Sequence, residues 1–264
     1  RGRAHGRPID GERVDPGQLV VCTQNHDQVG NRAAGDRLSH LVGPDALAVG
    51  ATLLLLGPNT PMLFMGEEWA ASTPWQFFTD HREEWLGEAV SNGRKSEFAR
   101  MGWDESTVPD PQDPETFTRS VLDWSEFAEE SGPENASRRA IFELHCALGR
   151  IRAARPEFRG PRFADVRVDG PAASEDARGD ERWVSLTIGG LALVANLGSG
   201  EQRVRLPRPA AATLLDTAEF LTARGVAVPG GATGTGVSGT ATAVIDAEDV
   251  VLPPMTAVAI ELAG

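Results

Sequence analysis

Asn25, His26 and Asp27 place an amide, an imidazole and a carboxylate side by side within the segment Gln24–Arg32. This segment directly follows a short apolar run, Leu19–Cys22, that is typical of a buried β-strand. Groups of these types can hydrogen-bond vicinal hydroxyls, and a carboxylate among them can stabilise positive charge that develops beside a sugar ring oxygen. The residue types therefore indicate glycosidic chemistry at the end of a strand.

The elements around this segment form a predicted β-α-β unit. Its strands are Leu19–Thr23 and Met62–Met65, and the helix Asp45–Leu56 lies between them. Both strands are short, continuous and apolar, as expected for strands buried on both faces of a parallel sheet. In a (β/α)8 barrel the chemistry lies just after the carboxyl ends of the strands, where Asn25–Asp27 and Glu67–Trp69 both fall.

The segment Gln24–Arg32 resembles the α-amylase family of glycoside hydrolases, in which Asn-His-Asp closes the seventh barrel strand. The continuation through Gly35–Leu38 and the later segment Pro61–Trp69 are most similar to a trehalose-releasing branch of that family. The resemblance implies that Asp27 is the third essential carboxylate, which stabilises the oxocarbenium-like transition state. It also implies that His26 donates a hydrogen bond to the same sugar.

Further residues near these segments are candidates for substrate binding. They are Asn25, Gln28, Arg32, Glu68, Trp75 and Phe78. Trp75 and Phe78 could stack on glucose rings, because an apolar sugar face suits an aromatic platform, and core packing is the alternative. For Glu67 and Glu68 the alternative is bracing of a loop, and for Asp27 it is capping of the next turn. A His-Asp pair can also ligate a metal, but no further ligand follows at short spacing, so no metal site is predicted.

The resemblance also implies an activity for the complete protein. It is hydrolysis of the α-1,4-glucosidic bond next to the terminal trehalose unit of maltooligosyl-trehalose, with retention of configuration and no cofactor. In the family the nucleophilic Asp and the acid/base Glu lie on earlier barrel strands. We therefore expect this chain to be the C-terminal part of a longer enzyme and to be inactive alone. Another enzyme of the family, such as a branching or debranching enzyme, and a non-catalytic carbohydrate-binding remnant are the open alternatives.

The middle of the chain, Ala70–Pro133, is aromatic and poor in periodicity, which predicts a long functional loop. Apolar residues then recur at helical spacing over Ile141–Ile151, and Pro156 ends the helix that this spacing predicts. Beyond it the period changes to two. Val184–Leu197 predicts a hairpin around the Gly189-Gly190 turn.

More strands are predicted toward the C-terminus, at Phe163–Val168, Gln202–Leu206, Thr240–Ile245 and Thr256–Leu262. The segment Gly225–Gly239, rich in Gly, Thr and Ala, is predicted to be a flexible excursion. The predicted fold is α/β plus all-β: residues 1–157 form the C-terminal portion of a (β/α)8 catalytic barrel, and residues 158–264 form an antiparallel β-sandwich domain.

Composition excludes several classes of partner. The chain has 264 residues, of which 41% are hydrophobic, enough for a sizeable core. A net charge of −13 opposes nucleic-acid binding, because a polyanion would be repelled, whereas a neutral sugar would not. Cys22 and Cys146 lie far apart, which indicates neither a disulfide framework nor a zinc site. The longest apolar run, Ala46–Leu56, is too short to span a membrane, and the expected location is the cytoplasm.

Overall fold

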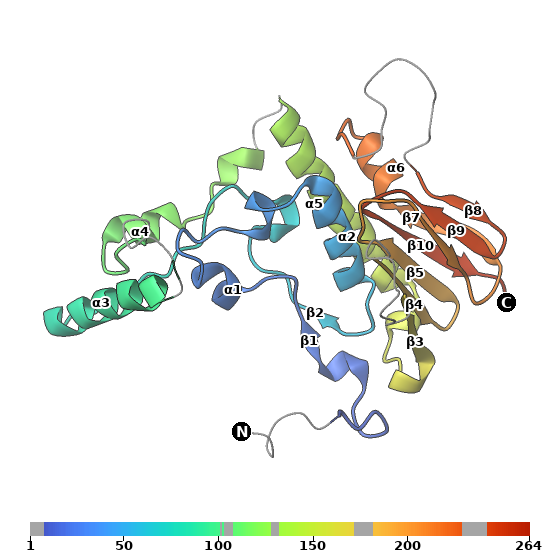
Figure 1. Ribbon diagram of the computed structural model, residues 1–264, viewed down its shortest axis with the longest axis horizontal. Helices are drawn as coiled ribbons and strands as arrows, with labels where there is room; N and C mark the ends of the chain where they lie inside the picture. The colour runs from blue at the N-terminus through green and yellow to red at the C-terminus, as the bar shows by residue number, and fades with distance from the viewer. Residues whose placement is uncertain (1–7, 101, 103–107, 128–131, 172–181, 229–241) are drawn as a thin grey trace. The chain divides into compact units, whose positions relative to one another are not determined.

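The computed structural model describes residues 8–100, 102, 108–127, 132–171, 182–228 and 242–264 (Figure 1). The chain divides into two compact units. Unit 1 comprises Arg1–Val21, Pro44–Met62 and Glu143–Gly264, and unit 2 comprises Cys22–Gly43 and Leu63–Phe142. The residues predicted to do chemistry lie in unit 2. The observed parallel pair, Val20–Val21 with Thr60–Pro61, and the C-terminal strands lie in unit 1.

The α-helices are α1 (His26–Gly30), α2 (Pro44–Leu55), α3 (Glu84–Arg100), α4 (Pro114–Arg119), α5 (Pro133–Ala154) and α6 (Thr217–Thr222). The strands are β1 (Val20–Val21), β2 (Thr60–Pro61), β3 (Val166–Asp169), β4 (Trp183–Ile188), β5 (Leu191–Asn196), β6 (Gln202–Arg205), β7 (Ala210–Asp216), β8 (Val244–Asp246), β9 (Asp249–Leu252) and β10 (Thr256–Leu262). Short 3-10 helices occur at Pro16–Gln18, Leu38–His40, Glu67–Trp69, Trp124–Phe127, Pro156–Phe158 and Phe163–Asp165.

In unit 1, β1 and β2 pair in parallel around the intervening helix α2, as the predicted β-α-β unit requires. The second strand lies earlier than Met62–Met65, so that prediction was wrong in its bounds. Thr60 N donates to Leu19 O at 3.0 Å and Met62 N donates to Val21 O at 2.8 Å, where the ladder ends. Pro61 fits between these donors because its position needs no N–H.

The two parallel strands are not buried on both faces, which corrects a second expectation. Val20 is 63% exposed, and Met62, Leu63 and Met65 are between 38% and 40% exposed. The physical reason is that the sheet of the described residues has only these two strands, so their apolar side chains have no neighbouring strand to pack against.

Helix α2 confirms the predicted helix within a residue at each end. Arg152 of α5 binds the carbonyl oxygens at its C-terminal end: Nη1 donates to Leu55 O at 2.7 Å and to Gly57 O at 2.8 Å, and Nη2 donates to Asn59 O at 2.7 Å. These carbonyls have no partner inside the helix, so the arginine supplies the cap and places a cation at the negative end of the helix dipole.

The C-terminal strands form a five-stranded sheet in the order β3-β4-β5-β10-β7 and a three-stranded sheet in the order β6-β9-β8. All of these pairings are antiparallel. Apolar side chains of β5, β6, β9 and β10 share one core, in which Val194, Val250 and Ile260 have 0% exposure. The predicted hairpin is confirmed as β4 and β5, with Trp183 opposite Asn196 and partly buried against the core.

The other predicted strands have mixed outcomes. Those beginning at Gln202 and Thr256 are confirmed as β6 and β10, whereas β7, β9 and α6 were not predicted. Strand β7 has the sequence Ala-Ala-Ala-Thr-Leu-Leu-Asp, which is poor in β-branched residues, so its local propensity is weak. The start of the predicted Thr240–Ile245 strand and most of Gly225–Gly239 lie outside the described residues.

Helix α2 packs on the five-stranded sheet within unit 1. Val49 contacts Ala195 of β5 and Ala257 of β10, and Leu53 packs against the same buried cluster. All six residues of β5 are therefore buried, although its sequence alternates weakly. The central strand has the shared core on one face and α2 on the other, which removes the period-two exposure expected of a surface strand.

Unit 2 contains the segment predicted to be a long loop. That prediction was wrong for α3 and α4, which are helical. Helix α3 buries only Gly87, Ser91 and Phe98. A helix with so few buried apolar residues has no apolar stripe, which is the signal that helical periodicity detects.

Candidate functional site

The turn that follows β1 is fixed by its own side chains. Asn25 is the N-cap of α1, and its Oδ1 accepts hydrogen bonds from Asp27 N at 2.8 Å and Gln28 N at 3.2 Å. In return, Gln28 Oε1 accepts a hydrogen bond from Asn25 N at 2.9 Å. This capping box satisfies N–H groups that the first turn of a helix leaves unpaired. The sequence predicts Asn25 and Gln28 as substrate ligands, and here these side-chain oxygens serve the cap.

His26 and Asp27 stand at the start of α1 with their side chains in solvent. The His26 side chain is 69% exposed and that of Asp27 is 72% exposed, and His26 Nε2 lies 3.3 Å from Asp27 Oδ1. Within the described part of the chain neither side chain has another polar partner. The imidazole and the carboxylate are therefore adjacent and accessible to a ligand.

The other end of α1 is held by Arg94 of α3. Its Nη2 donates to Gly30 O, and its Nη1 donates to Asn31 Oδ1 at 2.7 Å. The guanidinium carbon lies 4.5 Å from the ring centre of Phe77 and 4.8 Å from that of Phe98. Burial lowers the pKa of Arg94 from its usual value. The role of this arginine was not predicted, because its acceptors are more than sixty positions away in the sequence.

Trp75 and Phe78 belong to a chain of edge-to-face aromatic contacts. The Trp75 ring lies 5.7 Å from Phe64 and 5.4 Å from Phe78, and Phe78 lies 5.1 Å from Phe117. A Cβ atom on Gly30 would lie 3.6 Å from the Trp75 indole, so the same ring packs on α1. Both predicted platforms keep some exposure, and Trp75 also supports the helix that carries Asp27.

Gly35 allows the backbone to approach Trp75 closely. Its φ is +71°, and a Cβ atom there would lie 2.4 Å from Trp75 O. Trp75 N donates a hydrogen bond to Gly35 O at 2.9 Å. Only glycine readily adopts this left-handed backbone conformation and also fits where there is no room for a Cβ atom.

Glu67 connects the segments that follow β1 and β2. Thr23 Oγ1 donates to Glu67 Oε1 at 3.1 Å, and Phe64 N donates to Glu67 Oε2 at 3.2 Å. Burial raises the pKa of Glu67, while hydrogen bonds from Phe64, Thr23 and Gln24 act in the opposite direction. These contacts match the loop-bracing alternative for this carboxylate.

Arg37 is fully buried, with 0% exposure. Its Nε donates to Thr73 O, its Nη1 donates to Met65 O at 2.7 Å, and its guanidinium carbon lies 5.2 Å from the Phe64 ring centre. One arginine thus joins the loop after α1 to the backbone on both sides of Glu67–Trp69. In the sequence this arginine is visible only as part of the Gly35–Leu38 motif.

Among the carboxylates that act on this arginine, Glu68 has the largest electrostatic effect. Burial lowers the pKa of Arg37, and the charge of Glu68 opposes that effect most, followed by Glu126 and Glu67. Glu68 Oε2 is buried and accepts no hydrogen bond from the described residues. Arg32 lies nearby in sequence, with its Nε 3.4 Å from Asp36 Oδ2 and its side chain 35% exposed.

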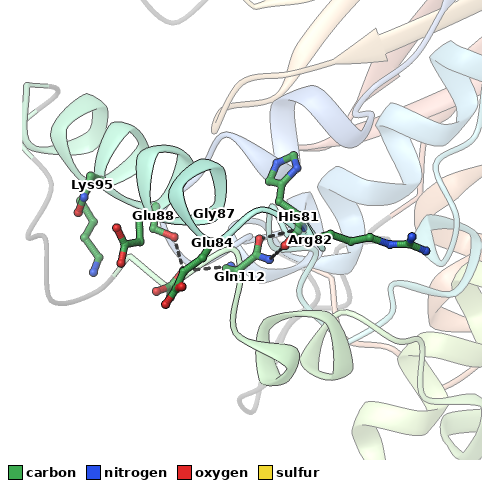
Figure 2. A pocket seen from close by; sticks show the side chains of 10 residues that line it. His81, Arg82, Glu84, Gly87, Glu88, Lys95 and Gln112 are labelled. Atoms are coloured by element: carbon green, nitrogen blue, oxygen red, sulfur yellow. Dashed lines mark hydrogen bonds between the residues drawn. The ribbon is translucent and has the colours of Figure 1, made fainter.

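A separate hollow lies along α3 (Figure 2). It has a volume of about 690 Å³ and is lined by one face of the helix, by His81 and Arg82 before it, and by Asp110 and Gln112. None of the residues predicted to bind substrate contributes to its lining. Neither this hollow nor the helix that forms it was predicted from the sequence.

The described residues contain no group of three or more His, Cys, Asp or Glu side chains that could hold a metal ion. Nor does any of the helices within those residues have the length and apolar character needed to cross a bilayer. Cys22 and Cys146 are both free and partly buried.

Most of the chain aligns with relatives that have curated names. It is 50% identical over 228 residues to a malto-oligosyltrehalose trehalohydrolase from Rhizobium sp. strain M-11, covering 86% of this chain and 36% of the relative. The chain is homologous to part of the malto-oligosyltrehalose trehalohydrolases. The Brevibacterium helvolum enzyme of that name is 47% identical over 83% of this chain and 35% of its own length. The one from Arthrobacter ramosus is 52% identical over 67% of this chain and 28% of its length.

This chain therefore spans about a third of the length of the malto-oligosyltrehalose trehalohydrolases that it matches. No protein-family model matches it. Among solved structures, it resembles a putative α-amylase from Salmonella typhimurium, with a TM-score of 0.67, 30% identity, and coverage of 94% of this chain and 36% of that one. An isomaltulose synthase from Protaminobacter rubrum, at 14% identity and a TM-score of 0.50, shares the fold over 93% of this chain and 43% of its own.

Proposed function

We propose that this chain is part of a malto-oligosyltrehalose trehalohydrolase. The complete enzyme hydrolyses the α-1,4-glucosidic bond next to the terminal trehalose unit of maltooligosyl-trehalose and releases trehalose. The observation that carries the proposal is the accessible His26–Asp27 pair, held on a capped turn directly after a parallel strand, in a chain that is 50% identical to an enzyme of that name.

In the proposed mechanism Asp27 binds the sugar at the point of cleavage and stabilises the positive charge of the oxocarbenium-like transition state. Its exposed carboxylate can turn toward a ligand because no other described residue holds it. His26 donates a hydrogen bond to a hydroxyl of the same sugar. Asn25 and Gln28 act mainly by fixing the turn, while Arg32, Glu68, Trp75 and Phe78 bind or border the substrate.

Bond cleavage itself needs two further carboxylates. A retaining glycosidase uses a nucleophile and an acid/base group about 5 Å apart. By the family resemblance these groups come from earlier barrel strands. We therefore propose that the 264-residue chain has no glycosidase activity by itself.

The proposed architecture has the C-terminal portion of a (β/α)8 catalytic barrel at residues 1–157 and a β-sandwich at residues 158–264. The parallel β1-α2-β2 unit supports the first part. The core shared by the five-stranded and three-stranded sheets supports the second, since every residue of that core lies beyond residue 190.

The proposed substrate is a neutral oligosaccharide, and the mechanism uses no metal or organic cofactor. A net charge of −13 does not repel such a ligand. Cytoplasmic location is part of the proposal, and the two free cysteines support a reducing compartment.

The test is the Asp27→Asn substitution in the full-length enzyme. If the carboxylate contributes about 3 to 4 kcal/mol in the transition state, turnover on maltooligosyl-trehalose falls by about two to three orders of magnitude while the melting temperature stays unchanged. His26→Ala should cost less and should also raise KM, because a neutral hydrogen bond forms before charge develops. Asp246→Asn, an exposed aspartate in β8, is the matched control.

An Asp27→Asn enzyme within tenfold of wild type would show that the assignment is wrong. Product analysis separates the open alternatives within the family. Release of free trehalose supports the proposal, whereas transfer of glucan to a new branch, or cleavage of α-1,6 bonds, would replace it with a branching or debranching function.

A further inference from the structure

The hollow along α3 has a rigid rim. Gln112 Oε1 accepts hydrogen bonds from Thr79 Oγ1 at 2.8 Å and from His81 N at 3.3 Å, and its Nε2 donates to His81 O at 2.8 Å. Asp110 Oδ1 accepts from Ser91 Oγ at 2.5 Å and from Gln112 N at 3.0 Å. The two loops and the helix are thus tied together, so the cavity of about 690 Å³ does not depend on a ligand for its shape.

Polar side chains on this rim have unused hydrogen-bonding capacity. Within the described residues the side chains of His81, Glu84, Glu88 and Asn92 have no polar partner. Figure 2 shows Glu84, Glu88 and Lys95 projecting from the same side of α3. Glu88 lies four positions after Glu84 and Lys95 lies seven positions after Glu88, which places the three on one helical face. A cavity whose lining includes donors and acceptors without a partner among the described residues, such as Glu84, Glu88 and Asn92, has the chemistry of a binding site.

The mixture of groups narrows the class of ligand. Glu84, Glu88 and Asp110 oppose an anion, and Lys95 and Arg82 oppose a cation. The residues described also hold no metal-binding group of three His, Cys, Asp or Glu. What the rim offers is carboxylate acceptors beside amide and ammonium donors, which suits a neutral molecule rich in hydroxyls.

An aromatic surface lies next to these polar groups. Trp85 is 68% exposed and follows Glu84 directly on α3. By helical geometry it is about 100° around the helix axis from Glu84, on the same flank as Asn92. An exposed indole beside hydrogen-bonding groups can cover the apolar face of a sugar ring.

We propose that the α3 hollow is a second carbohydrate-binding site, which takes a segment of about two or three glucose units of an α-glucan. Glu84 and Glu88 accept hydrogen bonds from sugar hydroxyls, Asn92 and Lys95 donate to them, and Trp85 contacts a ring face. The choice of an α-glucan rests on the proposed function, and the class of neutral, hydroxyl-rich ligand rests on the hollow alone.

The experiment is a calorimetric titration of the whole chain with maltotriose. Saturable binding is expected, and Glu88→Gln combined with Asn92→Ala should raise the dissociation constant about tenfold or more. The first change replaces a charged acceptor oxygen by an NH2 donor, and the second removes an amide donor from the rim. Trp85→Ala should weaken binding independently. Glu115→Gln, a 68% exposed carboxylate outside the hollow, is the matched control and should leave binding unchanged. Thermal melts followed by circular dichroism should give the same melting temperature for all variants, which shows that the proteins compared are folded.

Three outcomes overturn the proposal: no saturable heat with maltotriose, equal weakening by Glu88→Gln and Glu115→Gln, or binding that is lost in Asp27→Asn but kept in the α3 variants. Titrations with inorganic phosphate and with Ca²⁺ test the excluded classes, and saturable binding of either at the hollow would also overturn it. These readouts are independent of turnover by the full-length enzyme, so failure here and failure of the proposed function can be told apart.

Discussion

The Thr23 hydroxyl donates a hydrogen bond to the Glu67 carboxylate at 3.1 Å and so links the residue that precedes the Asn25 turn to the loop after β2. The same carboxylate accepts a second bond from Phe64 N. A single partly buried acid therefore holds together two segments that are forty-four positions apart in the chain.

Replacing Glu67 by Gln should change how stability depends on pH. Burial raises the pKa of Glu67 above its ordinary value of 4.5, so the folded state holds this proton more tightly than the unfolded chain. The contribution is fully present below the unfolded pKa and is lost as pH rises through the raised folded pKa. Since Gln does not titrate, the stability difference between wild type and variant should shrink from pH 4 toward pH 7 in urea unfolding.

Gln also cannot accept at both positions, which adds a loss of about 1 kcal/mol at every pH. Glu115→Gln is the control, because that carboxylate is exposed and its substitution should give a small, flat difference. A difference for Glu67→Gln that does not vary over this pH range would contradict burial of the acid.

Gly35→Ala should destabilise the chain by about 3 kcal/mol, because alanine at a φ of +71° is strained and its Cβ would collide with Trp75 O. Gly93→Ala is the matched control. Gly93 lies inside α3 with no atom near its Cβ position, so this change should be neutral or stabilise by up to about 1 kcal/mol. Chemical denaturation compares the two, and similar effects would refute the close approach.

Arg94→Ala should loosen α1, because it removes the donors to Gly30 O and Asn31 Oδ1 and exposes the faces of Phe77 and Phe98. We expect a loss of about 2 to 3 kcal/mol and faster hydrogen exchange in α1.

Arg94→Lys should recover less than half of that loss, since an ammonium lacks the planar fork that reaches both acceptors. Arg100→Ala, which removes an exposed local bond to Ser96 O, is the control and should cost no more than about 0.5 kcal/mol. Full rescue by lysine would show that charge alone holds α1.

The segment 158–264 should fold alone, since the core between its two sheets is made entirely of its own residues. It should be less stable than in the whole chain, because excision uncovers the sheet face that Val49 covers at Ala195 and Ala257. A thermal melt and gel filtration of the excised segment test this. Absence of a cooperative transition would place the domain boundary elsewhere, and Val258→Asp in the core supplies the unfolded reference.

Elements with a strong apolar pattern were predictable. Helix α5 carries apolar residues at helical spacing and β10 is a nearly continuous apolar run, and both were located correctly. Helix α3 was missed because its buried positions are held by Gly87, Ser91 and Phe98 rather than by an apolar stripe. The second strand was predicted too late in the chain because a proline inside a strand usually argues against pairing. Here the residues on either side of Pro61 supply the N–H donors to β1.

The candidate site divides in the same way. The capping box is a local signal, since Asn25 and Gln28 stand three residues apart, and the sequence could have supplied it. Arg37 and Arg94 could not be assigned from sequence, because the acceptors of Arg37 lie twenty-eight and thirty-six positions away and those of Arg94 lie more than sixty positions away. Their roles follow only from tertiary packing.

The cap of α1 is closed within four consecutive residues, Asn25–Gln28. The N-terminal turn that carries Asp27 is therefore capped by its own residues, whereas Arg94 and Trp75 hold the other end of the helix. The loops around this turn can change in length or composition without removing the cap. The capped turn Asn25–Gln28 can therefore be kept unchanged while the neighbouring loops are redesigned for a different glucan.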